Sequence, residues 1–167
     1  MERCGECGFD YDAGERADFP SRLRRLAADY RAALGSADAA ALRAHPVAAT
    51  WSALEYACHF RDVLVTQRQR VLLALAEEVP VFAPMRREER VTELDYNGQE
   101  PEAVAGQIDR AADRLAVTLA GLPAAGWART AVYGWPVRAV RDVEWMARHT
   151  LHEGVHHLAD IGRLLPG

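Results

Sequence analysis

The chain has 167 residues, of which 50% are hydrophobic, a length and composition that support one compact domain with a sizeable core. Its 24 acidic residues exceed its 20 basic residues, and no basic tract is present, which argues against nucleic acid as a partner because such binding needs clustered cations. All 20 basic residues are arginine, which excludes Schiff-base and P-loop lysine chemistry.

The sequence divides into an N-terminal arm and a helical domain. Residues 1–17 are rich in glycine and in acidic residues, and we expect them to form an irregular arm that carries the pair Cys4 and Cys7. Residues 18–167 show the hydrophobic periodicity of helices, and we expect them to form a single domain.

The first predicted helix runs from Asp18 to Gly35. Asp18 is a favourable N-cap, Pro20 suits the first turn, and glycine is typical of the position where a helix ends. The helix has one apolar face, formed at helical spacing by Leu23, Leu26, Tyr30 and Leu34.

The second predicted helix spans residues 51–78 and has the clearest start signal. Thr50 or Ser52 can cap it, and Ser52 with Glu55 has the spacing of a capping box. A Pro-containing segment, 79–100, follows it. The length of this segment favours a functional loop that covers another part of the molecule.

The third predicted helix runs from Pro101 to Gly121. Residues 122–138 contain turn residues and two tryptophans and are compatible with a short hairpin. The fourth predicted helix covers residues 139–164. Four helices without a convincing set of strands predict an all-α fold, a four-helix bundle.

Five of the six histidines are concentrated in two of these helices. His59 lies in the middle of the second helix. The others lie in the fourth helix and are His149, His152, His156 and His157. Side chains four residues apart share one face of a helix, so His152 with His156, or Glu153 with His157, can offer two ligands to one metal ion. His59 is then the candidate for a third ligand.

Helical periodicity only weakly indicates which pair faces the core. At 100° per residue, one apolar stripe of the fourth helix is formed by Leu151, Val155, Leu158, Gly162 and Leu165. His157 lies on one shoulder of this stripe beside Ile161, and Glu153 lies a little further round. The stripe slightly favours Glu153 and His157 as the pair that faces the core. The other pair, His152 and His156, belongs to residues 152–156, which match the HExxH pattern of zinc proteases.

Two segments resemble the DinB-like metal-binding four-helix bundle superfamily. They are WSALEYACHFRD at residues 51–62 and HEGVHHLADI at residues 152–161. The resemblance covers most of residues 18–165, including the order of the helices, and implies the same bundle fold. The Glu-x-x-x-His pair in the fourth helix resembles the branch that contains mycothiol-dependent maleylpyruvate isomerase.

The resemblance implies a metal site formed by His59, Glu153 and His157. In this family one ligand comes from the middle of the second helix and two come from the fourth helix, four residues apart. The last ligand lies three residues before a Gln or Asp, here Asp160. The position of Glu153 is usually a histidine. For two histidines and one carboxylate we expect Zn²⁺ first, with Ni²⁺, Mn²⁺ or Fe²⁺ as alternatives.

The implied function is a metal-dependent transfer reaction with a small thiol, for which mycothiol is the expected co-substrate. Three protein ligands leave a position for water or an anionic atom, and a bound cation lowers the pKa of a coordinated water or thiol. Metal-dependent hydrolysis and a non-catalytic, stress-associated metal-binding role are the alternatives. Arg61, Arg138 or Arg141 could hold a substrate carboxylate, and no residue is assigned to catalysis.

Cys4 and Cys7 have the spacing of half a zinc site. Three interpretations are open: a second zinc site completed by His152 and His156, a redox pair, or an inert arm. The first would attach the arm to the fourth helix and would explain the presence of four histidines there.

Other side chains that suggest chemistry are predicted to pack in the core. Cys58 precedes His59, but adjacent residues of a helix point about 100° apart, so the two cannot form a nucleophile–base pair. The aromatic residues after the third helix are expected to close one end of the bundle or to line the mouth of a substrate site, and they are Trp127, Tyr133 and Trp135.

The sequence shows no sign of export or of membrane insertion. No apolar stretch reaches about 18 residues, and the first 16 residues lack the apolar core of a secretion signal. Three cysteines argue against a disulfide framework and favour a reducing compartment. We therefore expect a cytoplasmic protein without a membrane partner, and a homodimer is a candidate assembly because related bundles often pair helices.

Overall fold

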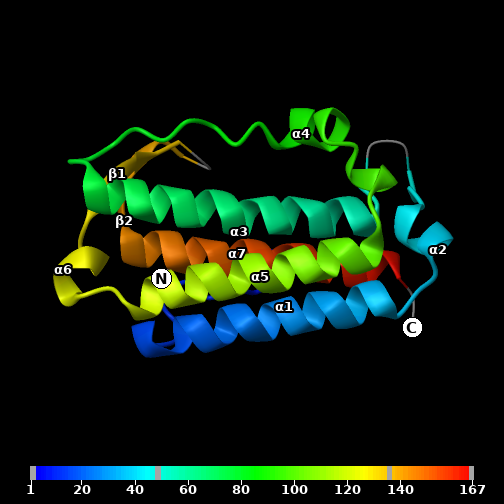
Figure 1. Cartoon of the computed structure of the whole chain (residues 1–167), viewed down its shortest axis with the longest axis horizontal. Helices are drawn as coiled ribbons and strands as arrows, with labels where there is room; N and C mark the ends of the chain where they lie inside the picture. The colour runs from blue at the N-terminus through cyan, green and yellow to red at the C-terminus, as the bar shows by residue number, and fades with distance from the viewer. Residues whose placement is uncertain (1–2, 48–49, 135–136, 166–167) are drawn as a thin grey trace.

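The computed structural model describes residues 3–47, 50–134 and 137–165, and shows a four-helix bundle with a two-stranded hairpin at one end (Figure 1). The long helices of this part of the chain are α1 (Phe19–Gly35), α3 (Ala53–Ala76), α5 (Pro101–Ala120) and α7 (Val143–Leu164). They confirm the predicted all-α class.

The long helices pack in the cyclic order α1, α5, α3, α7, and α7 closes the bundle against α1. In Figure 1 the hairpin and α6 (Ala124–Trp127) lie at one end and α2 (Ala39–Arg43) lies at the other. α4 (Arg87–Glu93) lies outside the bundle against α3. No helix in the described ranges combines the length and apolar character that crossing a membrane requires.

α1 has the predicted ends and the predicted buried face. Asp18 is its N-cap residue, Pro20 lies in its first turn, and Gly35 is its last residue. The residues of the predicted apolar face are all buried, and they are Leu23, Leu26, Tyr30 and Leu34. A short 3₁₀ helix, η1 (Arg16–Asp18), precedes α1.

The capping box predicted for the second long helix, α3, is present. The Ser52 hydroxyl accepts a hydrogen bond from the Glu55 amide at 3.2 Å, and the Glu55 carboxylate accepts one from the Ser52 amide at 2.8 Å. α3 ends at Ala76, close to the predicted end at residue 78. α5 begins at Pro101, as predicted.

Short helices occupy segments that the sequence analysis leaves without structure. α2 lies in the linker after α1, and α6 precedes the hairpin. The segment 79–100 contains α4 and the 3₁₀ helix η2 (Tyr96–Gly98). Helices this short show too little periodicity to be predicted from it, because they span only one or two turns. The start of α2 did have a local signal in the sequence, because aspartate is a favourable N-cap residue. In the structure the Asp38 carboxylate accepts a hydrogen bond from the Ala41 amide at 2.8 Å.

The hairpin lies where a short hairpin was expected, but it extends further along the chain. Its antiparallel strands are β1 (Thr130–Tyr133) and β2 (Ala139–Asp142). The fourth long helix therefore begins at Val143, and the prediction of a helix from residue 139 is wrong. Asp142 ends the strand and caps the helix, because its carboxylate accepts the Trp145 amide at 2.7 Å.

The face that α7 buries differs from the predicted stripe. Leu151 is buried, but Val155 and Leu158 are half-buried and Gly162 is exposed. The buried residues of α7 are Val143, Met146, Ala147, His149, Thr150, Leu151, Gly154, His157 and Ile161. The prediction failed because the centre of the true face is Gly154 and a histidine, which contribute nothing to a stripe of large apolar side chains.

The N-terminal arm is folded against α7. The Cys4 amide donates to the Phe9 carbonyl and the Gly8 amide donates to the Cys4 carbonyl, both at 2.9 Å. Phe9 and Tyr11 are buried with the hydrophobic core, and the Tyr11 ring stacks on Trp145 of α7 at a centroid distance of 6.1 Å. The arm therefore contributes to the wall of the bundle.

Candidate metal centre

The three ligands implied by the family resemblance meet where α3 packs on α7. Glu153 Oε2 lies 3.7 Å from His59 Nε2 and 3.6 Å from His157 Nε2. One ligand atom from each residue lies within 4.8 Å of the other two. In a tetrahedral site with metal–ligand bonds of about 2.1 Å, neighbouring ligand atoms are about 3.4 Å apart. The cluster is therefore close to the spacing at which one ion can contact all three side chains.

The ring of His157 is oriented by two neighbours. Its Nδ1 lies 2.8 Å from Asp160 Oδ2, and its ring stacks on Tyr56 of α3 at a centroid distance of 5.3 Å. A histidine that donates its Nδ1–H to a carboxylate leaves Nε2 with a lone pair, which is typical of metal-binding histidines. Nε2 is the nitrogen that lies near Glu153.

The pKa shifts in the cluster favour the ligand forms of Glu153 and His59. Burial raises the pKa of Glu153, but its interactions with the surrounding histidines outweigh this effect and hold it well below its usual range. Burial lowers the pKa of His59. Burial also lowers the pKa of His157, but Asp160 and Glu153 favour its charged form and raise the pKa overall. Glu153 is thus ionised and His59 neutral at pH 7, as metal ligands must be.

His59 has the unmet bonding capacity that a metal ion would satisfy. Its side chain is 3% exposed, and neither ring nitrogen has a hydrogen-bond partner among the described residues. A buried polar group without a partner costs about 1–3 kcal/mol. Because this imidazole faces an ionised carboxylate and a second imidazole, the residues present fit a divalent cation.

Gly154, the residue after Glu153, lets α3 and α7 approach each other at the level of the ligands. A Cβ atom at this position would lie 2.8 Å from the ring of Phe60, the residue after His59. The contact of this ring with the glycine backbone therefore sets the helix separation beside the cluster. Tyr30 fixes the same point from α1, because its hydroxyl donates to the Gly154 carbonyl at 3.0 Å.

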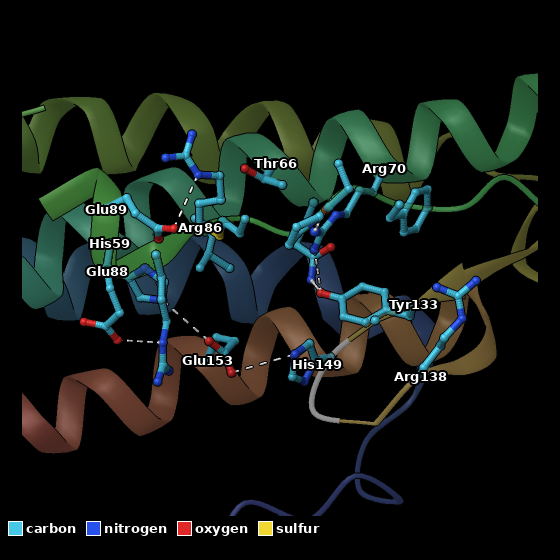
Figure 2. Close-up of a pocket in the computed structure, with 18 residues that line it drawn as sticks. His59, Thr66, Arg70, Arg86, Glu88, Glu89, Tyr133, Arg138, His149 and Glu153 are labelled. Atoms are coloured by element: carbon cyan, nitrogen blue, oxygen red, sulfur yellow. Dashed lines mark hydrogen bonds and ion pairs between the residues drawn. The ribbon is translucent and has the colours of Figure 1, made fainter. Parts of the chain in front are cut away.

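A cavity of about 370 Å³ opens beside the cluster (Figure 2). Its walls come from α3, α7, the hairpin and the segment after α3. The lining residues are His59, Val63, Thr66, Gln67, Arg70, Phe82, Ala83, Pro84, Met85, Arg86, Arg87, Glu88, Glu89, Tyr133, Gly134, Arg138, His149 and Glu153. The long segment after α3 thus covers the cluster, as expected from its length, and the cavity has the size of a small-molecule site.

His149 is a cavity residue that the sequence analysis did not assign to a site. It is buried, and its Nε2 lies 3.8 Å from Glu153 Oε1 (Figure 2). Its Nδ1 lies 2.8 Å from the Tyr11 hydroxyl of the arm, and its ring stacks on Trp145 at a centroid distance of 4.7 Å. A signal was present in the sequence, because His149, Glu153 and His157 follow one another at four-residue spacing on one helix face.

Arginines line the cavity, though not the set considered from the sequence. Arg138 is a lining residue, whereas Arg61 is hydrogen-bonded to Asp62 at 2.8 Å and Arg141 lies over the Trp145 ring at 4.4 Å. The other arginines of the lining are Arg70, Arg86 and Arg87. Arg86 and Arg87 could not be selected from the sequence, because their approach to the cavity depends on how the segment after α3 folds back.

The aromatic residues after α5 have different roles. Tyr133 lines the cavity, and its hydroxyl accepts hydrogen bonds from Gln67 at 2.7 Å and Arg70 at 2.8 Å. Trp127 is buried and is the last residue of α6, which lies at one end of the bundle (Figure 1). Trp135 lies outside the described residues. Tyr133 thus lines the cavity and Trp127 lies at the end of the bundle, so each of the two expected roles belongs to a different residue.

The second predicted set of ligands also comes together, on α7 and the arm. One ligand atom of each member lies within 4.8 Å of the others, and the members are Cys4, Cys7, His152 and His156. Burial raises the pKa of Cys4, but the nearby backbone amides and the His152 imidazole favour the thiolate and lower it to about 6. Cys58, in contrast, is buried in the core as predicted, and burial raises its pKa to about 12.

The fold and the site define a four-helix bundle with a His–Glu–His cluster between its second and fourth long helices. A family model of the DinB superfamily matches residues 22–161, which include all three residues of the cluster. The chain belongs to the DinB superfamily, as the sequence resemblance predicted. A comparison with curated proteins found no match.

Solved structures with the same fold include YfiT from Bacillus subtilis, described as a probable metal-dependent hydrolase with an unusual four-helix bundle topology. It matches with a TM-score of 0.78 at 15% identity, over 91% of this chain and 90% of that protein. The mycothiol-dependent maleylpyruvate isomerase matches with a TM-score of 0.74 at 16% identity, over 97% of this chain and 64% of the isomerase. The chain therefore spans less than two thirds of the isomerase, and at these identities the similarity establishes the fold.

Proposed function

We propose that this protein is a metal-dependent enzyme that uses a small thiol such as mycothiol to attack an electrophilic substrate, giving S-transfer or isomerisation. The observation that carries the proposal is a buried His–Glu–His cluster that borders a cavity of about 370 Å³ through His59 and Glu153. A purely structural metal site would need no such space beside its ligands.

Each residue of the cluster has a defined part in holding the ion. His59 supplies a buried imidazole without a hydrogen-bond partner in the described chain, Glu153 supplies an ionised carboxylate, and His157 supplies Nε2. We expect Zn²⁺ first, with Ni²⁺, Mn²⁺ or Fe²⁺ as alternatives. A divalent ion bound here would lower the pKa of a water or thiol that reaches it from the cavity.

The cavity walls favour a small anionic substrate with an apolar part. Arg70 and Arg138 approach from α3 and the hairpin, and Phe82 and Met85 supply apolar surface. A guanidinium group binds a carboxylate through paired hydrogen bonds, which would orient the substrate against the cluster.

His149 is well placed to move a proton inside the cavity. Its Nε2 lies near Glu153, while Tyr11 and Trp145 hold the ring from the other side. An imidazole nitrogen can accept or donate a proton, so His149 Nε2 can take a proton from the thiol or return one to the product.

Hydrolysis is the second candidate function. The matched structures point in both directions, since one is described as a probable metal-dependent hydrolase and the other as a mycothiol-dependent isomerase. Thiol chemistry is placed first because the Glu-x-x-x-His pair of α7 resembles the isomerase branch. A non-catalytic metal-binding role is the third candidate.

Metal content of the untagged protein tests the site. The assay is made in a Cys4→Ser/Cys7→Ser background, so that the cysteines of the arm cannot contribute. We expect about one equivalent of metal, which His157→Ala abolishes. His45→Ala is the matched control, because His45 contacts the Thr50 carbonyl outside the cluster. A background protein that binds no metal would refute the site.

Turnover by the metal-loaded protein then separates the three functions. We expect the protein to consume a carboxylate-bearing electrophile in the presence of mycothiol. S-methylated mycothiol, which has no free thiol, should not support this reaction. Turnover of an ester or amide without any thiol would favour the hydrolase. Full metal occupancy with neither activity would favour the non-catalytic role.

A further inference from the structure

We propose that Cys4, Cys7, His152 and His156 bind a structural Zn²⁺ ion that fastens the N-terminal arm to α7. One ligand atom from each of these residues lies within 4.8 Å of the others. Two thiolates and two imidazoles form a closed ligand set that is typical of structural zinc sites. This site is separate from the cluster that borders the cavity, and it does not depend on the proposed enzyme activity.

The position of His156 fits a tetrahedral zinc site. Cys4 Sγ lies 3.7 Å from His156 Nδ1. Zinc–sulfur bonds of about 2.3 Å and zinc–nitrogen bonds of about 2.0–2.1 Å place two such ligand atoms about 3.6 Å apart at tetrahedral angles. The other nitrogen of His156, Nε2, lies 3.4 Å from a carboxylate oxygen of Glu6. A carboxylate on the second nitrogen is typical of zinc-bound histidine, because it orients the ring.

The backbone around the two cysteines forms a tight turn, as in a zinc knuckle. The Cys4 amide donates to the Phe9 carbonyl and the Gly8 amide donates to the Cys4 carbonyl, both at 2.9 Å. Gly8 has φ 73, a left-handed conformation that glycine adopts without strain, and it lets the chain turn directly after Cys7. This turn places Cys4 and Cys7 together beside the two histidines of α7.

Both ring nitrogens of His152 are buried and have unmet bonding capacity. The side chain is 14% exposed, and neither of its ring nitrogens has a hydrogen-bond partner within the described ranges. Its Nδ1 lies 3.6 Å from Glu153 Oε1, beyond hydrogen-bond length. An imidazole in this state beside two cysteines is explained when one of its nitrogens binds a metal ion.

A zinc ion at this position would hold one wall of the cavity. The arm residue Phe9 packs on the His152 ring at a centroid distance of 5.6 Å, and Tyr11 contacts His149 at 2.8 Å. His149 in turn lines the cavity. Loss of the ion should therefore loosen the arm and increase hydrogen exchange at the Cys4 and Gly8 amides.

Metal content separates this site from the cavity cluster. All proteins are full-length, untagged and kept reduced. We expect about two equivalents of metal in the wild type and in His45→Ala, and about one in each of Cys4→Ser/Cys7→Ser and His59→Ala/His157→Ala. An unchanged zinc content in the cysteine variant would overturn the proposal. If the cysteine variant retained no metal while the wild type retained one equivalent bound by sulfur, the proposed enzyme site would be wrong and this inference would stand.

A spectroscopic measurement on the wild type makes the test independent of whether the variants fold. X-ray absorption at the zinc edge should show sulfur neighbours at about 2.3 Å. Cobalt substitution should give a thiolate-to-cobalt charge-transfer band that persists in His59→Ala/His157→Ala. A zinc-loaded wild type without sulfur neighbours, or a Cys4–Cys7 disulfide in protein purified under reducing conditions, would overturn the proposal.

Discussion

Replacing Gly154 with alanine would place a methyl group 2.8 Å from the Phe60 ring and 2.9 Å from Leu26 Cδ1. Ordinary carbon contacts are about 3.5–4.0 Å, so α7 would have to move away from α3, or Phe60 would have to leave its rotamer. Overpacking of this kind costs about 1–3 kcal/mol of unfolding free energy. The strain would act directly beside the predicted ligands Glu153 and His59, which precede Gly154 and Phe60 in their helices.

Gly162→Ala is the matched control for this substitution. Gly162 lies in the same helix, and within the described part of the chain no atom lies within 4 Å of an added Cβ. Both substitutions gain about 1 kcal/mol of helix propensity, so the difference between them isolates the steric cost. Gly154→Ala should be less stable than Gly162→Ala by about 1–3 kcal/mol. For a domain of this size, that corresponds to a Tm difference of about 2–12 °C.

The assay is urea and thermal unfolding of metal-free protein followed by circular dichroism, because a bound ion would itself shift the stability. A metal titration accompanies it, and Gly154→Ala should bind the cavity metal more weakly than Gly162→Ala. If the two variants were equally stable and bound metal equally well, the contact between Gly154 and Phe60 could not be what sets the distance between the ligands.

Three further substitutions test other parts of the structure. His149→Gln should retain metal but lower the kcat of thiol transfer about 10²–10⁴-fold, and an unchanged kcat would exclude His149 as the proton-transferring group. Ser52→Ala should cost about 0.5–2 kcal/mol in urea unfolding, because it removes the α3 cap; it also removes a 2.7 Å bond to Asn97. Burial raises the pKa of Asp62, but hydrogen bonds from Tyr96 and two arginines outweigh it and hold the pKa below its ordinary value of 3.8. This carboxylate therefore stabilises the fold above about pH 4 and loses that effect as the pH falls further. Asp62→Asn should have a lower unfolding free energy than the wild type at pH 7, and the difference should shrink below pH 4. A difference that stays constant with pH would contradict the lowered pKa of Asp62.

The sequence by itself determined the helix ends that depend on local chemistry. The Ser52–Glu55 box, Pro20 and Pro101 act within one turn of the backbone they start, so their effect is independent of the rest of the fold. The resemblance to the DinB superfamily also selected His59, Glu153 and His157 as a set, and metal binding by this set stays a prediction.

Only the tertiary structure decided which face of α7 lies inward, because that face is centred on Gly154, whose missing side chain is what admits Phe60. It also decided the strand β2, which exists through its pairing with β1. His149 became a cavity residue because the segment after α3 and the hairpin come together with α3 over its face of α7. Such contacts join segments far apart in the chain, and periodicity within one segment carries no information about its partners.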